Sequence, residues 1–219
     1  MKFYTYDAAP SPQRVALYMK YKGITIDTQQ IDMTAGEHLG DEYRAIVPDQ
    51  TVPALVLDDG TVLSEVIGII AYLEALYPET PLLGSTPLEK AMITSWNSKI
   101  YSMLYSSIAD ALRNTSPGFK GRALPGPLDL EQIPELAERG KIRINWAWKE
   151  LNRELAKRQF IAGDKFSFAD IDLLVAVGFS GWVKCKPPEE LTRLHEYITR
   201  ATAESVSYTH LTLPTKRIG

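Results

Sequence analysis

The chain has 219 residues, of which 45% are hydrophobic and 23% are charged, and its formal net charge is −3. This composition fits one large globular domain or two small ones, and the lack of a basic segment argues against nucleic-acid binding. No apolar run reaches the roughly 18 residues of a membrane span, and the segment MKFYTYDAAPSPQRV is too polar for a signal peptide. We therefore expect a cytoplasmic protein that associates with neither nucleic acid nor membranes.

The residues that most often bind metals are few and scattered. A single cysteine, Cys185, cannot form an internal disulfide or a cysteine metal cluster. The three histidines, His38, His195 and His210, do not have the spacing of metal ligands. The sequence therefore predicts no metal site.

The first 78 residues alternate strand and helix patterns. Residues 2–6 are aromatic and predict a strand. The pair Ser11-Pro12 then predicts a helix with Ser11 as its N-cap and Pro12 at its first position, and Gly23 is a natural end for that helix.

The pattern continues with a second strand predicted over residues 24–32 and a short helix near 41–46. Residues 52–63 alternate around an Asp-Gly turn, which predicts a β-hairpin. A third helix is predicted from Glu65, with apolar residues at helical spacing, and it ends before Pro78.

Behind this unit the pattern changes to helices alone. Prolines and a glycine predict a linker over 79–86, and the remainder predicts an all-helical domain over 87–203. The predicted helices cover 87–113 and 131–157, a segment starting at Ser167, and a final segment around 188–203. Residues 204–219 show no helical period, and we expect them to be a non-native or disordered tail.

The helix that starts at Ser167 carries a strong local signal. Ser167 and Asp170 form the pattern of a capping box, and Phe166 and Ile171 flank it as a hydrophobic staple. This pattern predicts a buried helix and concerns architecture rather than chemistry.

Three features of the first domain could carry chemistry, and each also has a purely structural interpretation. Ser11 could hold an anion at a helix N-terminus or simply cap the helix. A cis bond before Pro53 would present the backbone of Val52 to a ligand, although trans is the common form at such bonds. Glu65 could bind an amino group, or its carboxylate could only interact favourably with the positive end of the helix dipole.

The order of these elements and several segments resemble the cytosolic glutathione S-transferases, of a serine-type or related bacterial-like subgroup. The resemblance covers residues 1–203, and its TVPAL and FSFADI parts are fairly specific to the family. The matching segments are PSPQRVALYMKYKGI, GEH followed by EYRAIVPDQTVPAL, DDGTVLSEVIGIIAYLEALYPE, PLLGSTPLEKA and FIAGDKFSFADI. The resemblance implies an α/β thioredoxin-like N-terminal domain over 1–78, an all-α C-terminal domain, and a homodimer.

The resemblance also implies how glutathione, the co-substrate, would bind. The thiol would face Ser11, the catalytic residue, and the cysteinyl backbone would pair with Val52, whose bond to Pro53 is cis in the family. The γ-glutamyl group would meet Glu65 and the backbone of Val66. No metal takes part in this scheme.

Further positions follow from the same resemblance. The glycine end of glutathione would lie near Gln50 and His38. A small hydrophobic electrophile would lie between the domains, where the candidate contacts are Tyr101, Met103, Leu104, Tyr105 and Phe119, each of which could instead belong to the core.

The sequence departs from the family pattern at several positions. Relatives often place the hydroxyl two residues earlier, where this chain has Ala9, so Ser11 is the hydroxyl that remains. Val66 replaces a serine and removes a side-chain contact to the γ-glutamyl group, and Val47 replaces an asparagine.

The expected activity is conjugation of the glutathione thiolate to small hydrophobic electrophiles, as in detoxification. A glutathione-dependent disulfide reductase or peroxidase, or a non-catalytic binding protein with this fold, is the alternative.

Overall fold

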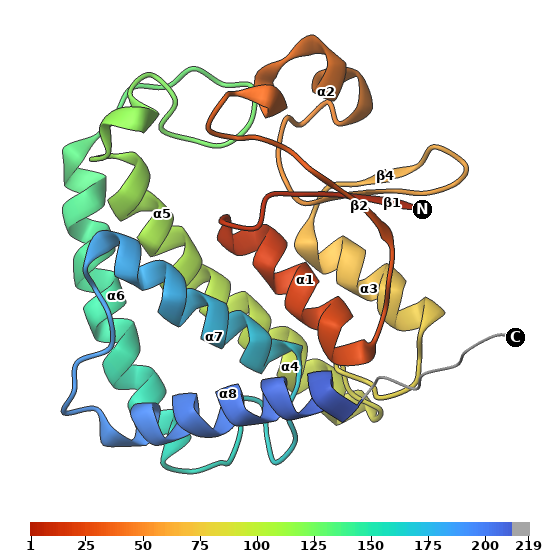
Figure 1. The fold of residues 1–219 in the computed structure, drawn as a ribbon. Coiled ribbons are helices and arrows are strands. Elements are labelled where there is room, and N and C mark those ends of the chain that lie inside the picture. The colour runs from red at the N-terminus through yellow and green to blue at the C-terminus, as the bar shows by residue number, and fades with distance from the viewer. Residues whose placement is uncertain (212–219) are drawn as a thin grey trace, which may run out of the picture.

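The computed structural model describes the backbone of residues 1–211 and the side chains of residues 1–206. An α/β unit is followed by a helical unit, as the sequence predicts (Figure 1). Among the helices described, none has an apolar stretch of the length that a bilayer requires.

The N-terminal unit is built on a four-stranded mixed sheet with the order β2-β1-β3-β4. β1 (Lys2–Thr5) pairs in parallel with β2 (Asp27–Gln30) and antiparallel with β3 (Ala54–Val56). β4 (Val62–Leu63) completes the predicted hairpin. The turn of this hairpin contains Gly60 at a φ of 86°, a conformation that glycine adopts without a steric cost.

Helices cover both faces of this sheet. α1 (Pro10–Lys22) and α3 (Val66–Leu76) pack against one face, whereas α2 (Asp41–Ile46) lies on the other (Figure 1). The short 3-10 helix Glu37–Leu39 precedes α2. This arrangement is a thioredoxin-like unit, and it confirms the predicted fold class of the first domain.

The start of α1 differs from the prediction. The helix begins at Pro10 with Ala9 as its N-cap, so Ser11 is the second helical residue and does not cap the helix. Both prolines suit the first helical position, because each has a fixed φ and no N–H group, and in this structure Pro10 occupies it. Ser11 nevertheless remains in the first turn.

The second unit is helical in the described residues, apart from two isolated β-bridges. The predicted stretch 87–113 is one helical run with a π-helical turn at Tyr101–Tyr105, in which the Ser106 N–H donates to the Tyr101 carbonyl five residues back. The α-helices of the second unit are α4 (Pro87–Ile100), α5 (Ser106–Arg113), α6 (Pro134–Leu155), α7 (Phe168–Ser180) and α8 (Thr192–Leu211).

The predicted capping box at the start of α7 is confirmed. The Asp170 carboxylate accepts a hydrogen bond from the Ser167 N–H at 2.8 Å, and it also accepts from the Ile161 N–H and the Tyr197 hydroxyl, both at 2.9 Å. Because Asp170 is fully buried, these donors compensate its lost hydration. They tie the start of α7 to α8.

The last helix is longer than predicted. α8 ends at Leu211 rather than near 203, because no Gly or Pro interrupts the sequence between Thr192 and Leu211. Its final residues therefore fall inside the predicted tail of 204–219, and the remaining residues of that tail, 212–219, lie outside the described residues.

The two units share one hydrophobic core, and a buried ion pair joins them. Arg14 of α1 donates to both carboxylate oxygens of Asp172 of α7, at 2.6 and 3.0 Å. Asn97 of α4 donates to the same carboxylate at 2.7 Å, and the Tyr105 hydroxyl donates to the Asp172 carbonyl at 2.9 Å. Arg14 is 3% exposed and Asp172 is fully buried, so water screens this pair little.

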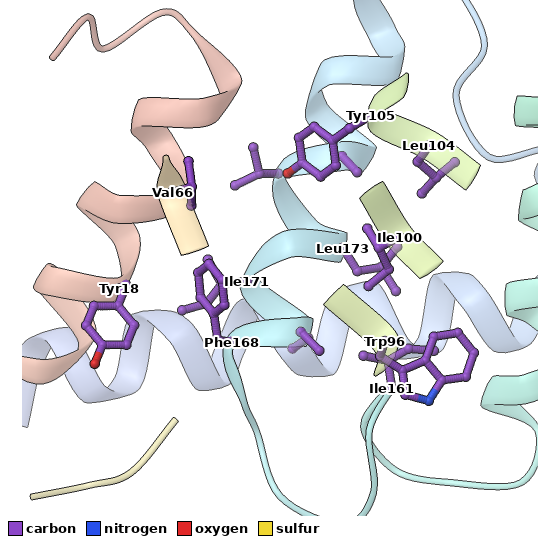
Figure 2. Packing of buried hydrophobic residues seen from close by; sticks show 14 of the residues in the cluster. Tyr18, Val66, Trp96, Ile100, Leu104, Tyr105, Ile161, Phe168, Ile171 and Leu173 are labelled. Carbon is purple, nitrogen blue, oxygen red and sulfur yellow. The ribbon is translucent and has the colours of Figure 1, made fainter. Parts of the chain in front are cut away.

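Apolar side chains surround the ion pair. Figure 2 shows Tyr105 beside α7 and Phe168 at the start of that helix, with Ile100 beside Leu173. The Arg14 guanidinium lies 4.6 Å from the centre of the Tyr105 ring, so its flat face packs on an aromatic surface. The interface is therefore both apolar and fixed in orientation.

We predict that Asp172→Asn lowers the free energy of unfolding by about 3–5 kcal/mol, because it leaves the buried Arg14 charge without a counter-ion. Urea denaturation followed by circular dichroism measures this. The control is Asp110→Asn, which breaks the largely exposed Arg139–Asp110 pair at 3.8 Å and should cost at most about 1 kcal/mol. Equal losses for the two variants would contradict the prediction.

Candidate functional site

Three segments that the sequence singles out come together at one end of the sheet. α1 begins just beyond the carboxyl end of β1, and β3 begins beside that end because Tyr4 pairs with Ala54. The Ser64 hydroxyl donates to Asp49 at 2.7 Å and so ties the loop before β3 to the start of α3. Ser11, Val52-Pro53 and Glu65 therefore border one region.

The start of α1 offers fewer backbone donors than an ordinary helix. Its first three residues are Pro10, Ser11 and Pro12, so Ser11 carries the one N–H group among them. The Gln13 N–H is already bonded to the Ala9 carbonyl at 3.2 Å. The half-buried Ser11 hydroxyl has no hydrogen-bonding partner among the described residues, so it is available to an anion.

The predicted cis peptide bond lies between Val52 and Pro53. Pro53 is buried and Val52 is half-buried at the start of β3. Within the described part of the chain, neither the N–H nor the C=O of Val52 has a hydrogen-bonding partner. These two groups are what an extended peptide needs for pairing.

The start of α3 presents a free carboxylate beside free N–H groups. Glu65 is the N-cap and is exposed, and its side chain makes no ion pair or hydrogen bond with the described residues. Val66, the first helical residue, buries its side chain, and the first N–H groups of a helix have no partner within it. A ligand with both an ammonium and a carboxylate group fits this pair of features.

Gln50 and His38 are both nearly buried beside α2, at 6% and 7% exposure. Gln50 has a φ of 53°, in the left-handed region that residues other than glycine rarely adopt. The Nδ1 atom of His38 has no hydrogen-bonding partner among the described residues. Burial, followed by the positive charges of Arg122 and Arg113, lowers the pKa of His38, which favours a neutral imidazole.

The residues predicted to contact the electrophile differ in exposure. Tyr101 is 57% exposed and stacks on Tyr105 with a centroid distance of 6.3 Å. Tyr105 is almost fully buried, and Leu104 is fully buried in the core beside α7. Leu104 is therefore not accessible to an electrophile at the surface of this structure. Phe119, in the loop after α5, lies under the Arg113 guanidinium at 4.4 Å.

Two aromatic residues near these were not predicted. The Phe179 ring lies 6.2 Å from Tyr105 and 5.5 Å from Trp182, and Trp182 is 52% exposed. They extend the row of aromatic rings from the π-helical turn to the end of α7. The sequence gives no signal for this, because α7 is apolar on most of its surface and its periodicity does not separate one face from another.

The comparison with known proteins shows which family the chain belongs to. The family described as "Glutathione S-transferase, N-terminal domain" matches residues 9–76. The "Glutathione S-transferase 2" of Saccharomyces cerevisiae is 32% identical over 203 residues, which cover 91% of this chain and 84% of that protein.

The chain belongs to the glutathione S-transferase family.

Solved structures of glutathione S-transferases superpose on both units. A glutathione S-transferase domain-containing protein of Marinobacter aquaeolei VT8 has a TM-score of 0.84 and 32% identity, covering 93% of this chain and 98% of that one. The structure of Gtt2 from Saccharomyces cerevisiae also has a TM-score of 0.84, with 30% identity over 95% of this chain and all of that one. The predicted family and its two-part fold are thus confirmed.

Proposed function

We propose that this glutathione S-transferase joins the thiolate of glutathione to small hydrophobic electrophiles. The observation that carries the proposal is the grouping of unpartnered groups around one end of the sheet. These groups are the Ser11 hydroxyl, the backbone of Val52 and the Glu65 carboxylate. They match the thiol, the cysteinyl backbone and the γ-glutamyl ammonium of one tripeptide.

The chemistry asks the protein to keep the thiol ionised. A free thiol has a pKa of about 8.5, and lowering it by about two units requires about 2.7 kcal/mol. The end of a helix dipole contributes about 0.3–2 kcal/mol, and a hydrogen bond to a charged group contributes about 1.5–3 kcal/mol. Because Pro10 and Pro12 remove two N–H groups from this helix end, the Ser11 hydroxyl carries a larger share here than in an ordinary helix.

The remaining groups position the two substrates. Glu65 and the N–H of Val66 would hold the two charges of the γ-glutamyl group, and Gln50 and His38 would lie near the glycine end. An apolar electrophile would rest on the exposed ring of Tyr101 and on the half-buried ring of Phe119. Holding both reactants in line supplies the rest of the rate increase.

The proposal includes a cytoplasmic location and a role in detoxification. A reducing compartment suits a chain with one cysteine and no internal disulfide.

We predict that Ser11→Ala raises the pKa of the bound glutathione thiol by about 1–2 units, equivalent to the loss of one charge-assisted hydrogen bond. The conjugation rate with an aryl halide at neutral pH should fall accordingly. Ultraviolet absorbance of the thiolate across a pH series gives the pKa. Ser11→Thr keeps the hydroxyl and is the control. An unchanged pKa in Ser11→Ala would remove Ser11 from the thiolate site.

Substrate comparison tests the reaction class. The wild-type protein should conjugate glutathione to an aryl halide faster than it reduces a glutathione mixed disulfide or a peroxide. Cys185 is unsuited to a redox step because it lies beyond α7, and burial raises the pKa of its thiol. Faster reduction than conjugation would favour a reductase or peroxidase. Failure to bind to immobilised glutathione would favour a non-catalytic binding protein.

A homodimer is the remaining part of the proposal. A groove of about 320 Å³ lies between α4 and α6, lined by apolar residues that include the half-buried Met92 and the exposed Trp146 and by charged residues that include Lys99 and Glu150. Exposed Leu88 and Ile142 lie one turn from Met92 and Trp146 on the same two helices. Ile142 is 70% and Trp146 is 52% exposed in the single chain. Apolar surface of this kind is the usual mark of a protein interface. A second copy of this chain is the proposed occupant.

We predict that Trp146→Glu shifts the protein from dimer to monomer, because it places a charge in the apolar centre of the interface. Light scattering coupled to size-exclusion chromatography measures the mass. Trp182→Glu is a matched control, since Trp182 is also 52% exposed but lies after α7. A monomeric wild-type protein, or two dimeric variants, would refute this interface.

A further inference from the structure

The loop between α5 and α6 reaches back to the N-terminal unit. Figure 1 shows it beside the segment that carries α2. A Cβ atom built on Gly126 would lie 3.5 Å from the Asp49 carbonyl, which is ordinary van der Waals contact. The helical unit therefore contacts the N-terminal unit next to Gln50.

Hydrogen bonds hold this loop in one shape. The Arg113 guanidinium donates to the carbonyls of Ala123 at 3.0 Å and Arg122 at 2.9 Å, and its face covers the Phe119 ring. The Ala123 N–H donates to the Leu130 carbonyl at 3.0 Å. The backbone on either side of Arg122 is thus fixed.

The side chain of Arg122 itself has no such role. Arg122 is half-buried, and its guanidinium makes no hydrogen bond, ion pair or ring contact with any residue that the structure describes. Arg113, by contrast, donates hydrogen bonds to the carbonyls of Arg122 and Ala123. The partial burial of the Arg122 guanidinium removes some of its hydration, and no counter-ion among the described residues compensates this loss.

The loop that carries Arg122 lies against the segment that carries His38 and Gln50, because Gly126 of the loop lies close to the Asp49 carbonyl. His38 is 7% exposed with an unpartnered Nδ1 atom, and Gln50 is 6% exposed with one long hydrogen bond, from its Nε2 to the Leu39 carbonyl at 3.4 Å. Burial lowers the pKa of His38, and the nearby charges of Arg122 and Arg113 lower it further. Polar groups with unused bonding capacity therefore lie on neighbouring segments of the two units, and a carboxylate bound between these segments would satisfy them.

We propose that Arg122 binds the glycyl carboxylate of glutathione from the helical unit, opposite His38 and Gln50. This rests on the function proposed above, and it adds a substrate contact made across the boundary between the two units. A guanidinium can bind both oxygens of a carboxylate at once, which fixes the orientation of the glycine end as well as holding its charge.

The test removes the charge from each partner in turn. Isothermal titration measures the binding of glutathione and of its glycyl ethyl ester to the wild-type protein and to Arg122→Ala. The wild type should bind glutathione about tenfold more tightly than the ester, and Arg122→Ala should bind the two alike. In turnover assays Arg122→Ala should raise the KM for glutathione about tenfold and leave kcat within about twofold, since the contact is far from the thiol.

Arg139→Ala is the control for a general change of charge, because Arg139 is an exposed residue of α6 that faces Asp110. It should keep the wild-type preference for glutathione over the ester. If Arg122→Ala keeps the preference, or if Arg139→Ala loses it equally, the assignment of Arg122 is wrong while the proposed function stands. If the wild-type protein binds neither compound, the proposed function fails as well.

Discussion

The ion pair between Arg14 and Asp172 is the interaction on which the arrangement of this protein depends. Arg14 lies one turn along α1 from Ser11, and the carbonyl of Asp172 holds the hydroxyl of Tyr105. One buried contact thus fixes both the helix end that would hold the thiolate and the wall that would face the electrophile. In the proposed function, the distance between the two substrates would therefore be set by packing between the units, and not within either unit alone.

The start of α1 offers fewer backbone N–H donors to a ligand than an ordinary helix end does. The two prolines fix the first turn of the helix but leave Ser11 with the one N–H group among the first three residues. The dipole of the helix still favours an anion there. In the proposed site, the loss of these backbone donors would leave more of the thiolate binding to the Ser11 hydroxyl, which a single substitution can remove.

Features with a local cause could be predicted from the sequence. The hairpin around Gly60, the capping box at Ser167 and the long helical stretches all depend on nearby residues, and they were predicted correctly. The N-cap of α1 is predicted two residues too late, at Ser11 instead of Ala9, because both Pro10 and Pro12 suit the first helical position. The burial of Leu104 and the part played by Phe179 depend on contacts between distant helices, which local patterns do not encode.

The π-helical turn at Tyr101–Tyr105 has a consequence for how this surface can change. Such a turn contains one residue more than an α-helical turn, so deleting that residue would close the run into a plain α-helix, whereas deleting one residue elsewhere in α4 would rotate everything after it by about 100° about the helix axis. Tyr105 would then leave the carbonyl of Asp172, and Gly140 of α6 would no longer lie against the backbone of Ser107, which a methyl group would meet at 2.5 Å. Substitution can therefore change the aromatic residues of this helical run, but shortening α4 outside the π-helical turn would disrupt both contacts at once.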